Sequence, residues 1–114
     1  MHELPITENI LDIALKHARQ ENAEEITDIY IVIGQLAYYI DESIQFYWQI
    51  ISKDTIAENS TLHFKRILAE FKCQQCENTY HPDSNSFTCP YCQSTDLTII
   101  AGREFYLESI EINK

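Results

Sequence analysis

The sequence feature that most constrains this chain is a set of four cysteines confined to one short stretch. Two Cys-x-x-Cys pairs, Cys73/Cys76 and Cys89/Cys92, are separated by twelve residues and account for all the cysteines of the chain. Two residues between cysteines let one tight turn direct both thiolates at a single point, and two such turns facing each other form a tetrahedron of sulfur atoms. The pattern predicts a closed structural zinc site, which leaves no coordination position open for a substrate.

Other roles for the four cysteines compete with zinc. Two pairs at this spacing, without a thioredoxin-like context, disfavour a redox pair. In the cytosol, paired cysteines hold metal more often than they form disulfides. A single iron ion remains an alternative, because four thiolates bind iron as well as zinc.

Apolar spacing predicts the elements on either side of the cysteines. Residues 6–19 carry apolar side chains three or four positions apart, which is one face of an amphipathic helix that starts at Thr7 or just before Pro5. A β-branched run over 26–33, closed by Gly34, is typical of a strand. The same reasoning predicts a helix over 42–53, capped by Asp41, and strands over 61–68, 97–101 and 105–112.

The order of these elements predicts an α+β fold, in which two helices pack on a small three-stranded sheet. We expect the last strand to return to the sheet made by the two earlier strands. The cysteine segment is then an inserted zinc-ribbon lobe. The predicted boundaries are 1–69 and 96–114 for the α/β lobe, and 70–95 for the zinc-ribbon lobe.

The charge balance excludes several classes of partner. Eight Lys and Arg against eighteen Asp and Glu give a net charge of −10, which repels phosphate backbones and anionic lipid. We therefore expect neither a nucleic-acid nor a membrane partner. The longest apolar runs fall short of the roughly 20 residues that span a bilayer, which predicts a cytoplasmic protein. We find no nucleophile with its base, no phosphate loop and no catalytic carboxylate pair, so we do not expect an enzyme.

The amino terminus carries a second candidate metal site. The amine of Met1, with the amide nitrogen and imidazole Nδ1 of His2, can close adjacent chelate rings around one ion. The amide of Glu3 lies near enough to complete a plane of four nitrogens. Such a tetragonal site suits Ni(II) or Cu(II) rather than zinc. A histidine at position 2 is usually an accident of a flexible terminus, so the spacing alone does not establish nickel binding.

Several segments taken together resemble one protein family. They are Met1–Leu4 (Met-His-Glu-Leu), Ile31–Gly34, Phe87–Cys92 and Gly102–Ile112, along with the amphipathic first helix and both cysteine pairs. In this order and spacing the chain resembles the HypA/HybF family of hydrogenase/urease nickel-incorporation proteins from end to end.

The resemblance implies a nickel metallochaperone with an α/β nickel-binding lobe and a structural Zn²⁺ ribbon. Its transient cargo is Ni²⁺, delivered to the precursor of a nickel–iron hydrogenase large subunit with a nickel-handling GTPase as partner. Urease maturation proteins are further partners in some bacteria. His2 is implied as the principal nickel ligand, joined by the Met1 amine and the Glu3 backbone nitrogen, with the Glu3 carboxylate tuning the site. Asp41 and His81 are lesser nickel candidates.

The sequence departs from the family pattern at Pro5, where serine is common. Proline is tolerated at a helix start because its missing N–H has no intrahelical partner there. We expect Pro5 to stiffen the entrance to the nickel site without abolishing it.

The alternative function is a zinc-ribbon adaptor that binds another protein and delivers no metal. Only a chaperone needs His2 and a free terminal amine, so the amino terminus distinguishes the two functions.

Overall fold

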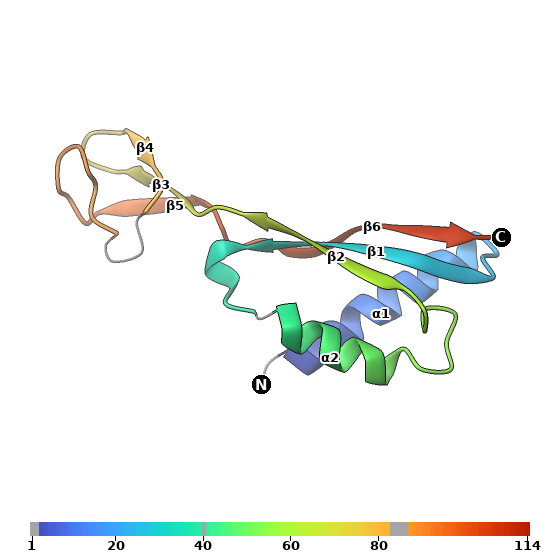
Figure 1. The fold of residues 1–114 in the computed structure, drawn as a ribbon. Coiled ribbons are helices and arrows are strands. Elements are labelled where there is room, and N and C mark those ends of the chain that lie inside the picture. Colours follow the sequence, from blue (N-terminus) through green and yellow to red (C-terminus); the bar gives the residue numbers. More distant parts are fainter. Residues whose placement is uncertain (1–2, 40, 83–86) are drawn as a thin grey trace. The chain divides into compact units, whose positions relative to one another are not determined.

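The computed structural model describes residues 3–39, 41–82 and 87–114, which form two helices and two small sheets (Figure 1). The elements are α1 (Glu3–Gln20), β1 (Glu25–Gly34), the 3-10 helix η1 (Gln35–Ala37), α2 (Asp41–Ile51), β2 (Thr61–Ile67), β3 (Glu70–Cys73), β4 (Thr79–Tyr80), β5 (Leu97–Ala101) and β6 (Phe105–Asn113). One sheet has the order β2-β1-β6 and the other β4-β3-β5. The predicted fold class is confirmed, and the last strand does return to the sheet of the earlier two. None of the helices in the described residues is long and apolar enough to cross a membrane.

The chain divides into two compact units. We call the first, Met1–Val32 with Tyr39–Lys65 and Phe105–Lys114, the helical unit, and the second, Ile33–Tyr38 with Arg66–Glu104, the ribbon unit. The ribbon unit is larger than the expected 70–95 lobe, because long-range hydrogen bonds join its two segments, Ile33–Tyr38 and Arg66–Glu104. We call the place where these two segments meet the base of the ribbon unit. The N–H of Leu36 donates to the Gly102 carbonyl at 2.7 Å, and the N–H of Ala69 donates to the Gln35 side-chain oxygen at 2.8 Å.

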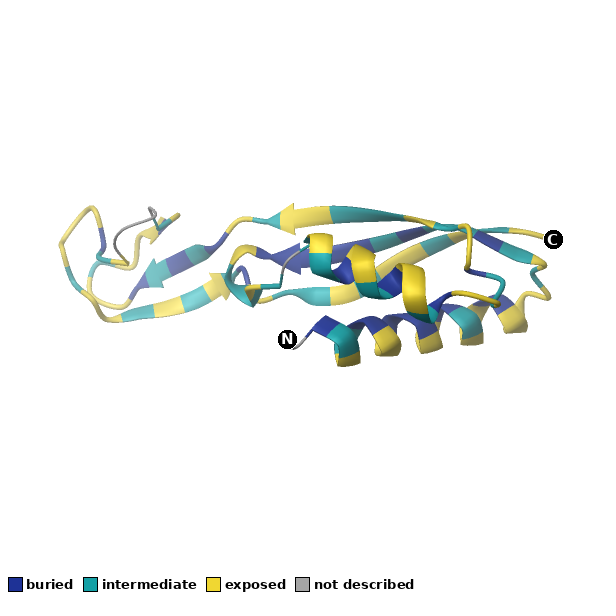
Figure 2. Cartoon of the chain, turned by 60° about the horizontal axis from the view of Figure 1, so that its bottom comes forward, coloured by how far each residue is buried: buried dark blue, intermediate teal, exposed yellow. Residues whose placement is uncertain are grey.

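In the helical unit, α1 packs against α2 and β6. Figure 2 shows the sheet-facing sides of both helices as buried and their outer sides as exposed. The buried positions of α1 include Ile10, Ala14 and Ala18, which follow the predicted spacing. Within α2, Ile44 and Trp48 are buried, and the Trp48 indole N–H donates to the Ser60 hydroxyl at 2.9 Å.

The start of α1 differs from the prediction. The helix already includes Glu3, and Thr7 lies inside it, where its hydroxyl donates to the Glu3 carbonyl one turn earlier. Thr7 is therefore not a cap. Pro5 lies in the first turn, where backbone N–H groups have no acceptor four residues earlier, so its ring costs the helix no hydrogen bond.

The ribbon unit has a small core around the middle strand β3. Its buried residues are Ala69, Phe71, Cys73, Tyr80 and Cys89. The ring of Phe71 makes edge contacts with those of Tyr80 and Phe87, with ring centroids 5.8 and 5.2 Å apart. A core of this size falls below what ordinarily holds an independent domain, so the unit depends on a metal or another link for its stability.

The two glycines of the chain meet at the base of the ribbon unit. A Cβ on Gly34 would lie 2.1 Å from the carbonyl oxygen of Gly102. Gly102 has a φ of +119°, and a Cβ on it would lie 2.8 Å from the Cα of Ala69. Two backbone segments far apart in sequence can approach this closely only because neither glycine carries a side chain.

We expect Gly34→Ala to lower the free energy of unfolding by more than about 2 kcal/mol, because the added methyl group meets backbone atoms that cannot rotate away. Thermal and urea unfolding measure the change. The exposed substitution Gln49→Ala on α2 is the control and should change stability by less than about 0.5 kcal/mol. Equal stability of Gly34→Ala and the wild type would contradict this close approach.

Candidate metal centre

The two cysteine pairs lie in turns of the same backbone design, Cys73–Asn78 and Cys89–Ser94. In each turn the N–H of the first cysteine donates to the carbonyl of the sixth residue, at 2.9 Å in both. The N–H of the fifth residue donates to the carbonyl of the first cysteine, at 3.0 and 2.9 Å. That fifth residue, Glu77 or Gln93, has a φ of 64° or 66°, in the left-handed region. The repeated hydrogen bonds fix the direction in which each pair of sulfur atoms points.

The four sulfur atoms converge on one point. All four Sγ atoms lie within 4.8 Å of one another, with Cys73 and Cys92 3.4 Å apart and Cys76 and Cys89 3.7 Å apart. A tetrahedral ion with metal–sulfur bonds of about 2.3 Å requires sulfur atoms about 3.8 Å from one another. The distances exceed the roughly 2.05 Å of a disulfide bond, and all four cysteines are free. The site fits a single metal ion such as zinc.

Hydrogen bonds to sulfur favour the thiolate form. The N–H of Gln75 lies 3.4 Å from the Cys73 sulfur, and the Asn78 side-chain N–H₂ lies 3.3 Å from the Cys76 sulfur. The backbone N–H of Cys76 is the largest influence that lowers the pKa of Cys73, to about 6. The backbone N–H of Asn78 likewise lowers the pKa of Cys76.

The fourth thiol, Cys92, is held in its neutral form by the neighbouring thiols. The backbone N–H of Ser94 acts to lower the pKa of Cys92, but hydrogen bonding with the Cys73 thiol, desolvation and the other two cysteines outweigh it and raise that pKa to about 12. Four neighbouring thiols therefore do not all ionise unaided. A divalent cation between them compensates the charge, so metal binding releases protons.

The predicted nickel ligands Met1 and His2 lie outside the described residues. Glu3 is the first described residue of α1 and is only 6% exposed, and Asp41 is the half-buried first residue of α2. In Figures 1 and 2 both helices begin at the same end of the helical unit. His81 is exposed, and its Nδ1 lies 2.8 Å from the Ala69 carbonyl oxygen.

Across the described ranges, the four cysteines are the one set of three or more His, Cys, Asp or Glu side chains whose ligand atoms come together. The structure thus gathers the predicted zinc ligands, and His81 is not among them. Sequence reasoning missed Asn78, whose carbonyl accepts the hydrogen bond from Cys73 that closes the first turn and whose side-chain N–H₂ contacts the Cys76 sulfur. A signal for it was present, because Asn78 and Ser94 follow the two cysteine pairs at the same offset.

Comparisons with known proteins agree with one another. The sequence profile described as "Hydrogenase/urease nickel incorporation, metallochaperone, hypA" matches residues 1–112. A hydrogenase maturation factor HypA from Dehalococcoides mccartyi is 41% identical over 113 residues, which cover 99% of this chain and 95% of the relative. A HypA from Caldanaerobacter subterraneus subsp. tengcongensis is 38% identical, over 98% of this chain and 99% of the relative.

Solved structures share the fold. The solution structure of the Ni metallochaperone HypA from Helicobacter pylori aligns with a TM-score of 0.69 at 20% identity and covers 99% of this chain and 98% of that one. A second HypA solution structure aligns with a TM-score of 0.74, also at 20% identity, over 98% of this chain and 96% of that one. With the profile and the relatives, which span nearly the whole chain, this protein belongs to the HypA family of hydrogenase/urease nickel-incorporation metallochaperones.

Proposed function

We propose that this protein binds Ni(II) at its amino terminus and delivers it to the precursor of a nickel–iron hydrogenase, and to urease where the organism makes that enzyme. The observation that carries the proposal is the extent of the family match, which begins at residue 1 and so includes the Met-His-Glu start. A closed four-cysteine site has no position for a transient cargo, so the cargo requires a second site elsewhere in the chain.

We infer that the four cysteines hold Zn²⁺ and that this ion is structural. Their sulfur spacing fits a tetrahedral ion, and two matched turns direct them. When bound, the ion neutralises the thiolates and links the two turns. The small core around Phe71 makes such a link necessary for the ribbon unit.

The proposed nickel ligands are nitrogen atoms of the first three residues. They are the amine of Met1, the amide nitrogen and imidazole Nδ1 of His2, and the amide nitrogen of Glu3. An N–H in the first turn of a helix takes no part in the i to i−4 ladder, so the Glu3 amide can lose its proton without breaking an α1 hydrogen bond. The positive end of the helix dipole favours the amide anions that remain.

Asp41 and His81 stay lesser candidates for nickel. Asp41 is the first residue of α2, and α1 and α2 begin at the same end of the helical unit, which supports keeping Asp41 as a candidate. His81 belongs to the ribbon unit, and its Nδ1 is engaged by the Ala69 carbonyl. Its other ring nitrogen is the atom that a metal would take.

The proposed setting is the cytoplasm, where a nickel-handling GTPase and the hydrogenase large subunit precursor are the expected partners. Urease maturation proteins join them where urease is made. The protein acts by binding and release rather than by catalysis. A zinc-ribbon adaptor without metal delivery is the alternative, and the nickel measurements below distinguish the two.

We expect one zinc ion per chain, measured by elemental analysis of protein purified under reducing conditions. Structural zinc sites contribute roughly 10–16 kcal/mol of apparent binding energy in small peptides. Removing the ion, or Cys92→Ala, should therefore disorder residues 70–95 while the helical unit keeps its amide NMR signals. Gln93→Gly in the same turn is the control and should retain zinc, because glycine accepts the positive φ. Protein with neither zinc nor iron would disprove the site.

We expect nickel binding to require a free terminal amine and His2. An extension before Met1 converts the amine into an amide, and His2→Ala removes the imidazole, so both should weaken nickel binding strongly without changing zinc content. Binding should also fall as the pH drops through about 6.5, because a protonated imidazole does not coordinate. Titration of zinc-loaded protein, followed by the optical band of planar Ni(II), measures both effects. Equal affinity in all three forms would support the adaptor instead.

Deleting the gene should lower hydrogenase activity at limiting nickel, and excess nickel in the medium should restore it. A chaperone speeds the delivery of nickel to the hydrogenase precursor. Without it, nickel still reaches the precursor slowly, and a higher nickel concentration makes up for the slower delivery. Complementation with His2→Ala should fail at limiting nickel, whereas the Gln49→Ala gene should succeed. Full hydrogenase activity of the deletion strain at limiting nickel would count against delivery to this enzyme.

A further inference from the structure

The four cysteines of the candidate metal centre differ in their exposure to solvent. Cys73 and Cys89 are buried, at 0% and 1%, Cys76 is half-buried, and Cys92 is exposed. A reagent in solution therefore meets Cys92 before it meets the other three. When a metal ion holds all four sulfur atoms as thiolates, their reactivity differs through access and through the hydrogen bonds that each sulfur accepts.

The two matched turns also differ in one hydrogen-bond donor. In each turn, the backbone N–H two residues after the second cysteine donates to that cysteine, from Asn78 to Cys76 and from Ser94 to Cys92. The Asn78 side chain adds a second hydrogen bond to the Cys76 sulfur, at 3.3 Å. The Ser94 hydroxyl instead accepts the Asp96 N–H at 3.0 Å, and within the described ranges it makes no bond to the Cys92 sulfur. A hydrogen bond stabilises a thiolate and makes it a weaker nucleophile, so Cys92 is the more nucleophilic of the two.

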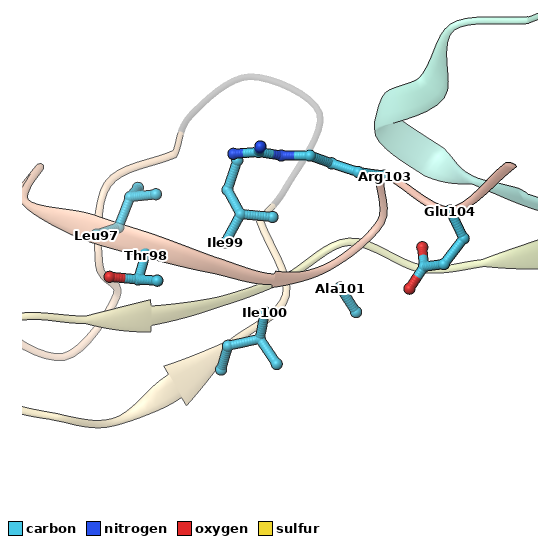
Figure 3. A pocket seen from close by; sticks show the side chains of 7 residues that line it. All are labelled: Leu97, Thr98, Ile99, Ile100, Ala101, Arg103 and Glu104. Carbon is cyan, nitrogen blue, oxygen red and sulfur yellow. The ribbon is translucent and has the colours of Figure 1, made fainter.

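Cys73 is placed to complete a reaction that begins at Cys92. Their Sγ atoms are 3.4 Å apart, and a disulfide needs about 2.05 Å, so a small movement of the side chains joins them. The next residue, Gln74, holds this turn beside β5: its N–H donates to the Asp96 carbonyl at 2.9 Å, and its side chain donates to the Thr98 hydroxyl. Figure 3 shows Thr98 on β5, where it lines a hollow of about 510 Å³.

We propose that Cys92 is a site of oxidation by peroxides, and that its oxidation forms a disulfide with Cys73 and releases the zinc ion. This inference rests on the structural zinc proposed above. The Cys92 thiolate attacks one oxygen of hydrogen peroxide: an S–O bond forms, the O–O bond breaks, and hydroxide leaves. The Cys73 thiolate then attacks the Cys92 sulfur: the S–S bond forms, the S–O bond breaks, and a second hydroxide leaves.

The balance of this reaction accounts for the loss of the metal. Two electrons pass from the two sulfur atoms to the peroxide, which is reduced to two hydroxide ions. Only Cys76 and Cys89 then remain as thiolates, and two ligands do not enclose a tetrahedral ion. The ribbon unit therefore exchanges a metal link between its turns for a covalent one.

Treatment of the full zinc-loaded chain with less than one equivalent of hydrogen peroxide tests the proposal. A zinc-binding dye measures the released ion, and proteolytic cleavage after Tyr91 separates Cys89 from Cys92 for tandem mass spectrometry. We expect zinc release to match disulfide formation, and the disulfide to join Cys92 to Cys73. Brief treatment with iodoacetamide gives a second readout, in which Cys92 should be alkylated first.

Variants outside the four ligands test the role of the hydrogen bonds. Ser94→Asn gives the second turn the side-chain donor of the first and should slow zinc release about fivefold. Asn78→Ser removes that donor from the first turn, so Cys76 should appear among the alkylated residues. Ser109→Asn and Asn9→Ser make the same changes at exposed positions of the helical unit and should leave both readouts unchanged.

The zinc content, measured before peroxide is added, separates two kinds of failure. Protein that contains no zinc would contradict the structural zinc itself and this proposal with it. Three results with zinc-loaded protein would overturn this proposal alone: a cysteine other than Cys92 alkylated first, a disulfide that does not join Cys92 to Cys73, or zinc release from Ser94→Asn as fast as from the wild type.

Discussion

The convergence of four sulfur atoms on one point is the constraint on which the ribbon unit depends. The turns that carry them begin sixteen positions apart in sequence, at Cys73 and Cys89, and each is internally hydrogen-bonded. What joins one turn to the other is the set of contacts around Phe71 and the meeting of their sulfur atoms, where the proposed ion would bind. Hydrogen bonding with the Cys73 thiol, desolvation and the other two cysteines raise the pKa of Cys92, so the four thiols do not readily become anions together. Four thiolates so close together are unfavourable without a metal, because their negative charges lie side by side. For the same reason a divalent cation between them would bind strongly.

A structural ion and a cargo ion have opposite requirements, and the function proposed above assigns them to ligands of different type. Four thiolates enclose an ion completely and keep it. The nitrogen ligands proposed for the cargo suit a different metal, Ni(II) or Cu(II). Under this proposal, soft sulfur ligands for one metal and planar nitrogen ligands for the other would keep the two ions from competing for one site.

How far the sequence predicted the structure depends on how local each feature is. The cysteine ligands were predictable because two residues between cysteines fix one turn. The strand over 26–33 and the return of the last strand followed from apolar runs that the structure confirms. The base of the ribbon unit was not predictable, because it rests on contacts such as Leu36 with Gly102, which are 66 positions apart. The helix start was missed for a local reason: Thr7 satisfies its hydroxyl one turn back, which no spacing reveals.

Along the chain, most of the ribbon unit is inserted between β2 and β6, two strands of the helical unit's sheet. This insertion affects the entropy of folding. If the ribbon unit loses its order, the chain from Arg66 to Glu104 becomes a loop of 39 residues that the helical unit must still close. The cost of closure grows only with the logarithm of loop length, so this loop costs about 2 kcal/mol more than a four-residue turn. The helical unit can bear that cost from its own core. The ribbon unit can therefore become disordered when its proposed metal is lost, while the helical unit, which includes α1, stays folded.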